Sequence, residues 1–281
     1  MTSLKIIKDS KILVSEIKKY KLKKKKIGFV PTLGALHQGH LELIRLAKKQ
    51  SDIVVVSIFL NPLQFNFKRD FDKYPINLIA DKKKICKEKV NILYIPTIKE
   101  VFPNKIKKIK ASSKSKILCG KYRKGHFDGV VTVLKSLFNQ VKPNTALFGE
   151  KDYQQILVVK DLIKNYKMKI KIFIVPTLRD SKGLAYSSRN KLLNEKQKKI
   201  ASYLFKTIKE IFIQAKKNPN KLNDLEIKGR NKLINYGFNT VDYLEIYNEN
   251  NLSKINIKKN NMRVFVAAFI GNTRLIDNYK N

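Results

Sequence analysis

Two histidines three positions apart are the residues of this chain best suited to chemistry. His37 and His40 lie in PTLGALHQGH, which follows the apolar run Ile27–Val30 and precedes residues with helical apolar spacing. A strand should therefore turn into a helix here, and the N–H groups and positive dipole end of a helix N-terminus suit a phosphate. Gly34 and Gly39 would let the backbone approach a ligand closely. Together these features predict a nucleotide site.

Zinc is the main alternative for a histidine pair. The chain has one further histidine, His126, and its two cysteines, Cys86 and Cys119, form no close ligand pair. We therefore expect no metal held by protein side chains alone.

Two neutral amides, Asn61 and Gln64, follow a second apolar run in SIFLNPLQF. Amides bind hydroxyl and carboxylate oxygens without changing their protonation state. Ordinary turn chemistry at Asn61-Pro62 is the simpler explanation of this pattern.

The segment GEKDYQQ, which begins at Gly149, also follows a strand-like run. Lys151 can meet a phosphate, and Asp152 can accept from ribose hydroxyls or cap the next helix. Further along, Ser187, Ser188 and Arg189 supply hydroxyls and a guanidinium that can hold a triphosphate, although a polar linker would have a similar composition.

Strand-like and helix-like patterns alternate over the first 175 or so residues and must position these groups. The expected strands are Ile27–Pro31, Ile53–Leu60, Asn91–Ile95, Thr145–Phe148 and Ile170–Val175; the expected helices are His40–Gln50, Asn77–Lys89, Val130–Val141 and Gln154–Asn165. This alternation predicts an α/β fold with a Rossmann-like, doubly wound parallel sheet. Because His37, Asn61 and Gly149 each follow a strand, the sheet should gather them on one edge.

The pattern changes after Pro176, which predicts two domains, 1–176 and a smaller α+β domain, 177–281. The expected elements of the second are helices Glu195–Lys217 and Leu222–Tyr236 and strands Val241–Tyr247 and Arg263–Ile270.

The net charge of +38, from 60 basic and 22 acidic residues, suggests a nucleic-acid-binding protein as an alternative class. We disfavour it, because no recognition helix or aromatic RNA-binding motif is present and because an AT-rich coding sequence enriches Lys, Asn and Ile. The stretch Lys105–Lys124 has nine basic residues and no acidic one, and we expect it to be a solvated loop. No signal peptide or long apolar span is visible, which together with the cysteine content favours a cytoplasmic protein.

Seven sequence blocks follow one another almost from end to end: PTLGALHQGH, VSIFLNPLQF, DFDKYP, GHFDGV, LFGEKDYQQ, GLAYSSRN and AAFIGNTRLIDN. Together they resemble the pantothenate synthetase (pantoate–β-alanine ligase) family. The wider superfamily of nucleotidyltransferases and class I aminoacyl-tRNA synthetases shares the H-x-G-H motif. N-P-x-Q-F and G-E-K-D-x-Q-Q distinguish this family from those relatives.

The resemblance implies an AMP-forming ligase that condenses (R)-pantoate with β-alanine. Pantoate and ATP would form pantoyl adenylate and pyrophosphate, and β-alanine would then displace AMP to give (R)-pantothenate. It also implies a cytoplasmic homodimer that uses Mg²⁺ carried by the ATP phosphates, with no nucleic-acid or membrane partner, and a C-terminal domain that closes over the ATP site. A nucleotidyltransferase that leaves its product adenylylated is the alternative enzyme.

The resemblance also implies roles for individual residues. His37, His40, Lys151 and Arg189 would be catalytic, with His40 as a proton donor. Gln64 would bind pantoate and border the β-alanine site, and Gln155 would bind pantoate. The implied ATP-binding residues are Leu33, Gly34, Ala35, Leu36, His37, Gln38, Gly39, His40, Gly149, Glu150, Lys151, Asp152, Leu178, Tyr186, Ser187, Ser188 and Arg189.

Three positions depart from the family pattern. Leu33 replaces the usual methionine with a side chain of similar volume, so we expect a mild effect. Tyr186 stands where methionine or leucine is usual and changes the fine shape of the ATP pocket. Lys124 replaces a proline before Gly125-His126.

Overall fold

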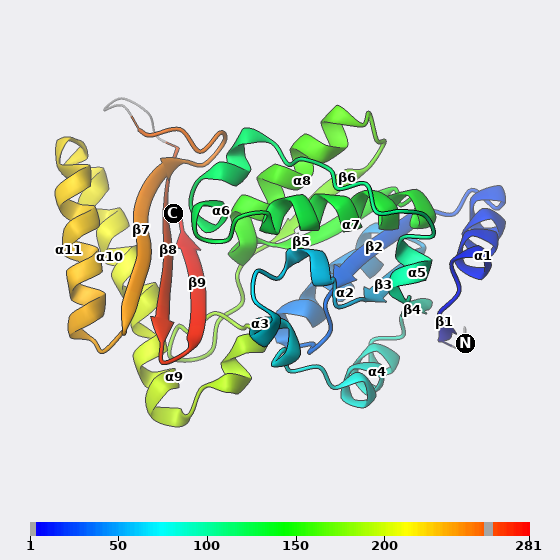
Figure 1. Cartoon of the computed structure of the whole chain (residues 1–281), viewed down its shortest axis with the longest axis horizontal. Helices are drawn as coiled ribbons and strands as arrows, with labels where there is room; N and C mark the ends of the chain where they lie inside the picture. Colours follow the sequence, from blue (N-terminus) through cyan, green and yellow to red (C-terminus); the bar gives the residue numbers. More distant parts are fainter. Residues whose placement is uncertain (1–3, 256–260) are drawn as a thin grey trace. The chain divides into compact units, whose positions relative to one another are not determined.

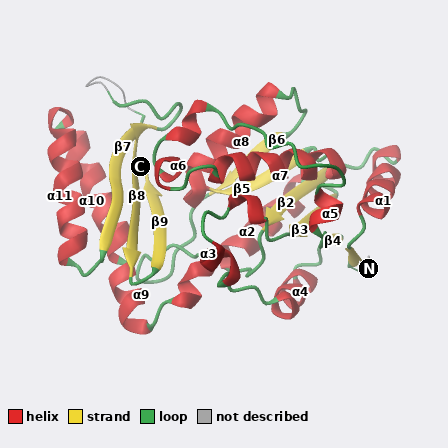
Figure 2. Ribbon diagram, viewed as in Figure 1, coloured by secondary structure: helices red, strands yellow, loops and turns green. Residues whose placement is uncertain are grey.

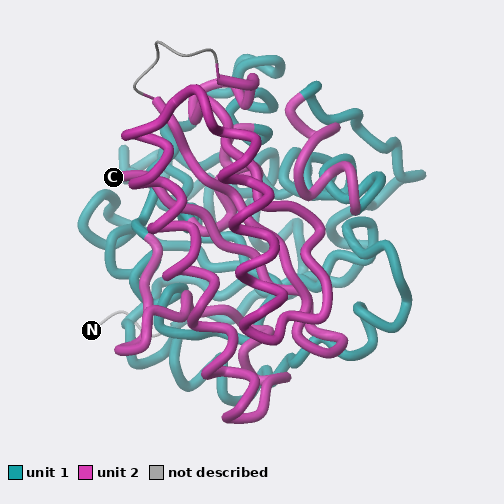
Figure 3. The backbone as a smooth tube through the Cα atoms, turned by 90° about the vertical axis from the view of Figure 1, so that its left-hand side faces the viewer, with its two compact units in different colours: residues 1–113, 123–150, 158–176 teal, residues 114–122, 151–157, 177–281 magenta. Residues whose placement is uncertain are grey.

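The strands of the computed structural model, which describes residues 4–255 and 261–281, form two separate sheets (Figures 1 and 2). Six parallel strands follow the order β1-β4-β3-β2-β5-β6, and three antiparallel strands follow the order β7-β8-β9. The chain divides into two compact units, coloured separately in Figure 3. Unit 1 comprises residues 1–113, 123–150 and 158–176, and unit 2 comprises residues 114–122, 151–157 and 177–281.

The parallel sheet of unit 1 confirms the predicted doubly wound α/β fold. Its strands are β1 (Lys5–Ile7), β2 (Ile27–Thr32), β3 (Ile53–Ile58), β4 (Ile92–Tyr94), β5 (Thr145–Gly149) and β6 (Lys171–Val175). The first of these strands was not predicted, because three residues are too few to show a period. The chain builds outward from β2 through β3 to β4 and then continues on the other side of β2 with β5 and β6. The direction of building therefore reverses between β2 and β5, which is where sheets of this kind bind ligands.

Helices cover both faces of this sheet because successive strand residues point to opposite sides. Val30 and Val56 pack in one cluster with Ile44 of α2, whereas the ring of Phe29 lies 6.1 Å from that of Phe138 in α7. The helices in unit 1 are α1 (Ser10–Leu22), α2 (Gln38–Gln50), α3 (Lys68–Asp72), α4 (Leu78–Lys87), α5 (Ile98–Val101) and α7 (His126–Val141); α8 (Tyr153–Asn165) has residues in both units.

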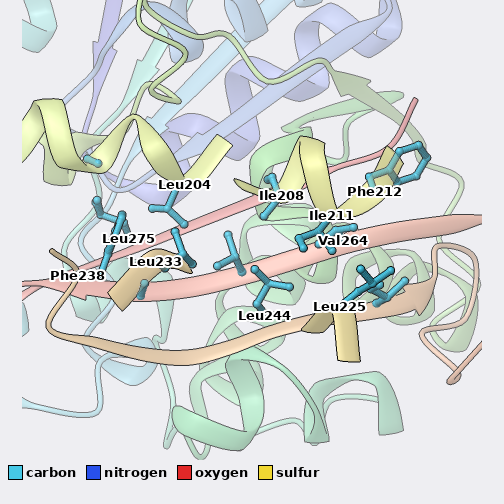
Figure 4. Close-up of a cluster of buried hydrophobic side chains, with 14 of the residues drawn as sticks. Leu204, Ile208, Ile211, Phe212, Leu225, Leu233, Phe238, Leu244, Val264 and Leu275 are labelled. Carbon is cyan, nitrogen blue, oxygen red and sulfur yellow. The ribbon is translucent and has the colours of Figure 1, made fainter. Parts of the chain in front are cut away.

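The antiparallel sheet of unit 2 carries two long helices on one face. Leu204, Ile208 and Ile211 of α10 pack with Leu225 of α11 and Leu244 of β7 (Figure 4). The elements of this unit are α6 (Cys119–Tyr122), α9 (Glu195–Ala201), α10 (Tyr203–Lys217), α11 (Leu222–Asn235), β7 (Thr240–Asn248), β8 (Met262–Ile270) and β9 (Thr273–Tyr279).

The single helix predicted over Glu195–Lys217 is wrong, because the chain breaks it at Ser202. The Ser202 hydroxyl donates to the Lys199 carbonyl at 2.7 Å, and such a local bond competes with the helical pattern.

The other face of the small sheet is covered by segments 114–122 and 151–157. The Cys119 Sγ lies 3.0 Å from the Tyr243 hydroxyl, and burial raises the pKa of that hydroxyl, so it stays protonated. Gln154 donates to the Lys114 and Ile117 carbonyls and accepts from the Cys119 N–H. Residues 114–122 are therefore packed, and the expectation of a solvated loop over all of Lys105–Lys124 is wrong. The prediction rested on the many lysines of this segment and overlooked the short apolar run that contains the buried Leu118.

Candidate functional site

The loop after β2 is held by a buried carboxylate that the sequence did not reveal. Asp81, in α4, is fully buried and accepts the backbone N–H groups of Ala35 at 2.7 Å and Leu36 at 2.8 Å. Hydrogen bonds to an ionised acceptor are the stronger kind, so they fix this loop firmly. The signal available was weak: Asp81 stands four residues before Ile85, on the apolar face of its helix.

Two successive residues of this loop have left-handed backbone. Gly34 has a φ of 87°, and a Cβ at that position would lie 3.1 Å from Ile58 Cγ2. Ala35 has a φ of 53°, which is strained for a residue with a Cβ. The two hydrogen bonds to Asp81 offset that strain.

The loop ends at His37, the N-cap of α2. The His37 N–H donates to His40 Nδ1 at 3.3 Å, and the two ring centroids are 4.0 Å apart. Because Nδ1 accepts, the neutral His40 ring carries its proton on Nε2, where it can donate. The structure therefore brings two imidazoles together at the N-terminus of a 13-residue helix, an arrangement that suits a phosphate.

The loop after β3 holds the amide of Gln64 in one orientation. Asn61 is fully buried, and its Nδ2 donates to Gln64 Oε1 at 3.0 Å and to the Gly129 carbonyl at 3.1 Å. Its own oxygen accepts from the Leu63 N–H at 3.2 Å, so the turn interpretation of Asn61 is confirmed. Since Gln64 Oε1 already accepts a bond, its NH₂ group is the part that can donate to a carboxylate or hydroxyl.

Three residues in or just before the GHFDGV block contact the turn that contains Gln64, and none of them had a predicted role. His126 Nδ1 lies 2.7 Å from the Gln64 carbonyl oxygen, and Arg123 Nη2 donates to the same oxygen at 3.2 Å. A Cβ on Gly129 would lie 2.2 Å from the Leu63 carbonyl oxygen, so only glycine lets α7 approach this closely. These contacts involve backbone atoms, for which no sequence pattern exists.

The segment after β5 divides between the two units. Gly149 ends β5 opposite Val175 of β6, and Glu150 follows it in unit 1. Lys151 belongs to unit 2, where its Nζ lies 3.2 Å from Asp152 Oδ2. In the Gln-Gln pair that follows, the Gln154 amide makes hydrogen bonds to backbone atoms of segment 114–119. Gln155 is half-buried on α8.

Unit 2 has its own small hollow, which is partly open to solvent. Lys151, Ser187 and Arg189 line it together, although Lys151 is far from the other two in sequence. The remaining lining residues are Leu184, Ala185, Asn190, Leu204, Arg274, Leu275, Ile276 and Asp277. A lysine, an arginine and a hydroxyl are suitable ligands for a phosphate chain.

The predicted site residues thus divide between the two units. Unit 1 contains Leu33, Gly34, Ala35, Leu36, His37, Gln38, Gly39, His40, Gln64, Gly149 and Glu150. Unit 2 contains Lys151, Asp152, Gln155, Leu178, Tyr186, Ser187, Ser188 and Arg189. In unit 1 the loops follow the adjacent parallel strands β3, β2 and β5, so the predicted gathering at one sheet edge is confirmed.

Two features are absent from residues 4–255 and 261–281. These residues hold no group of three or more His, Cys, Asp or Glu side chains placed to bind a metal ion. No helix among them has the length and apolar character needed to cross a membrane.

Comparisons with known proteins identify one family. The family model described as pantoate-beta-alanine ligase matches residues 5–280. A pantothenate synthetase from Buchnera aphidicola subsp. Acyrthosiphon pisum (strain 5A) is 44% identical over 279 residues, which cover 98% of each chain.

Two solved structures share the whole fold. Pantothenate synthetase from Thermus thermophilus has a TM-score of 0.90 at 32% identity and covers 98% of both chains. Pantoate-beta-alanine ligase from Francisella tularensis, complexed with beta-gamma ATP and beta-alanine, has a TM-score of 0.82 at 36% identity; the match covers 99% of this chain and 97% of that one.

Proposed function

This chain belongs to the pantoate-beta-alanine ligase family, and on that premise we propose that it condenses pantoate with β-alanine, using ATP, to form pantothenate. The observation that carries the proposal is the loop pinned by Asp81. It places His37 and His40 at the N-terminus of α2, beside the point where the sheet reverses, and Gln64 follows the neighbouring strand. A relative complexed with beta-gamma ATP and beta-alanine supports both as substrates.

In the first step, a carboxylate oxygen of pantoate attacks the α-phosphorus of ATP. The new bond joins that oxygen to the α-phosphorus. The bond from the α-phosphorus to the oxygen that bridges it to the β-phosphorus breaks, and pyrophosphate leaves. This step activates a carboxylate that is otherwise a poor acyl donor.

We assign phosphate binding to His37, His40, Lys151, Ser187 and Arg189. A proton on His40 Nε2, together with the α2 N-terminus, would stabilise charge on the phosphate oxygens, and Lys151 and Arg189 would neutralise the departing pyrophosphate. ATP would enter as its Mg²⁺ complex. Positioning and electrostatic stabilisation then supply the rate, since no protein nucleophile takes part.

The Gln64 amide would donate to pantoate, and Gln155 would provide a second contact. In the second step, the amine of β-alanine attacks the acyl carbon of pantoyl adenylate. The bond from that carbon to the AMP oxygen breaks, the amine nitrogen loses a proton, and pantothenate and AMP are released. We also assign Gln64 to the border of the β-alanine site; its side-chain amide is oriented by Asn61, and His126 contacts its backbone carbonyl oxygen.

The decisive experiment measures AMP release from MgATP and pantoate, with and without β-alanine. We expect turnover to require both acids and to produce pantothenate. An adenylylated product that persists in the presence of β-alanine would instead identify a nucleotidyltransferase.

Three further properties belong to this proposal. We propose a homodimer, which sedimentation would test, and a cytoplasmic location, with which the free thiols of Cys86 and Cys119 are compatible. We also propose a domain boundary after Pro176, which is supported by the uninterrupted stretch 177–281 in unit 2.

A further inference from the structure

The hollow of unit 2 is lined by three separate stretches of chain. Lys151 comes from the turn before α8, Ser187 and Arg189 come from the segment after β6, and Arg274–Asp277 come from β9. The first two stretches carry proposed ATP-binding residues, and the third has no proposed role. Their relative position decides whether Lys151 and Arg189 can meet one phosphate chain.

Asn278 of β9 holds the stretch that contains Lys151 by a hydrogen bond. Its Nδ2 donates to the Lys151 carbonyl oxygen at 2.9 Å, and its Oδ1 accepts from Arg263 Nη1. An amide donates with its nitrogen and accepts with its oxygen, so this one side chain serves both partners. The side chain is 4% exposed, so these contacts are shielded from water.

Arg263 fixes which way that amide faces. Its guanidinium is 1% exposed, lies 3.3 Å from Glu249 Oε2 and packs 3.8 Å from the ring centre of Tyr153. A buried cation needs acceptors, so the oxygen of Asn278 must point to it and the NH₂ group must point to Lys151. Tyr153, two residues after Lys151, is thereby held as well.

Asp277 holds the segment that leads into Ser187 and Arg189. Its two carboxylate oxygens accept from Arg179 Nη1 at 2.6 Å and Nη2 at 2.9 Å. Arg179 also donates to the Gly183 carbonyl and pairs with Ala185 in a short antiparallel bridge. This bridged turn leads directly into Ser187–Arg189.

We propose that Asp277 and Asn278 are positioning residues that set the spacing between the Lys151 and Ser187–Arg189 stretches for ATP binding. Successive residues of a strand point to opposite faces, so one short stretch of β9 can hold a separate segment on each side. This inference rests on the proposed function for its choice of ligand. It gives a role to the late block TRLIDN, which the reaction itself did not require.

The test uses two near-isosteric variants and an ATP analogue, α,β-methylene-ATP with Mg²⁺, in a binding titration. Asn278→Asp keeps an acceptor for Arg263 and turns a second acceptor toward the Lys151 carbonyl. Asp277→Asn removes one of the two acceptors for Arg179. We expect each variant to bind the analogue about tenfold more weakly, equivalent to roughly 1.4 kcal/mol.

Steady-state kinetics separate positioning from general damage. We expect kcat/KM for ATP to fall in both variants while the KM for β-alanine stays at the wild-type value. A smaller folded fraction would instead lower kcat and leave the KM for both substrates unchanged, and that result would contradict the proposal.

Glu226→Gln is the matched control. Glu226 is also buried in unit 2 and accepts the Ile246 N–H of β7 at 2.8 Å, but it does not line this hollow. We expect it to lower thermal stability and leave analogue affinity unchanged. An equal loss of affinity in this control, or no loss in Asn278→Asp and Asp277→Asn, would overturn the proposal.

The titration also distinguishes this inference from the proposed function. If the wild-type protein forms no pantothenate but binds the analogue, and both variants weaken that binding, the inference stands and the reaction assignment fails. If the wild-type protein makes pantothenate and both variants bind the analogue normally, the reaction stands and the inference fails. A wild-type protein that does not bind the analogue overturns both.

Discussion

Asp81 shows how one buried carboxylate can shape a site that it does not enter. Its two oxygens hold the Ala35 and Leu36 amides, and the Ala35 backbone is left-handed. The orientation of His37 follows from this anchor, because His37 is the next residue and caps α2. The chemistry of the loop therefore depends on a residue 46 positions away.

We predict that Asp81→Asn lowers both stability and activity. An asparagine NH₂ group would face a backbone N–H, so one strong hydrogen bond is lost at a cost of about 1.5–3 kcal/mol. Urea unfolding should show this loss, and single-turnover pyrophosphate release should slow. Asp52→Asn is the control: Asp52 also accepts a backbone N–H, from Lys26, but lies before β3 at the other end of the strand. Equal slowing in both variants would contradict the role of Asp81.

His40 and Lys151 should act on adenylate formation and not on folding. We predict that His40→Ala and Lys151→Ala each slow this step about 10²–10³-fold, as loss of a charge-stabilising donor usually does. Rapid-quench measurement of pyrophosphate under single-turnover conditions checks this, with circular dichroism to confirm the fold. His40→Gln, which keeps an N–H donor, should recover part of the rate. Near-parent rates in the alanine variants would remove these residues from the phosphate site.

At the scale of elements, the packing of α7 against the turn Pro62–Gln64 decides where Gln64 lies. The helix was predicted from its apolar pattern, but its close approach depends on Gly129, which has no side chain to clash with Leu63. Helical periodicity shows which face is buried and cannot show how near the partner backbone comes. This is why Gln64 was predicted and its supports were not.

We predict that Gly129→Ala destabilises the protein, although alanine in place of glycine usually stabilises a helix by about 0.8–1 kcal/mol. The added Cβ must push the turn away from α7, so the KM for pantoate should rise. Thermal unfolding and a pantoate titration provide the two measurements. Gly229→Ala is the control, because its Cβ would meet Leu244 side-chain atoms in unit 2. It should reduce stability and leave the KM for pantoate unchanged; a change in that KM would indicate a general effect.

At the scale of the whole molecule, the net charge of +38 should speed the encounter with anionic substrates. We predict that kcat/KM for MgATP falls several-fold as ionic strength rises from about 0.1 M to about 1 M, because the screening length shrinks from roughly 10 Å to 3 Å. The zwitterion β-alanine has no net charge, so its kcat/KM should change little and serves as the internal control. A kcat/KM for MgATP that does not change with ionic strength would show that the net charge does not speed ATP binding.

The sequence by itself determined the order of the main elements, the doubly wound sheet and the family. Apolar periods and glycine turns are local properties, so runs such as Ile27–Thr32 and Gln38–Gln50 could be read with errors of a few residues. The histidine pair and Gln64 were also accessible, because their meaning lies in residue type and nearby spacing.

Only the tertiary structure decided what holds those residues. Asp81, Gly129 and Asn278 act through backbone atoms of Ala35, Leu63 and Lys151, which lie 46, 66 and 127 positions away. A backbone amide or carbonyl has the same chemistry at every residue, so the sequence carries no sign of which one a distant side chain will meet. That choice is made when the strands take their places in the sheet and the helices pack against them.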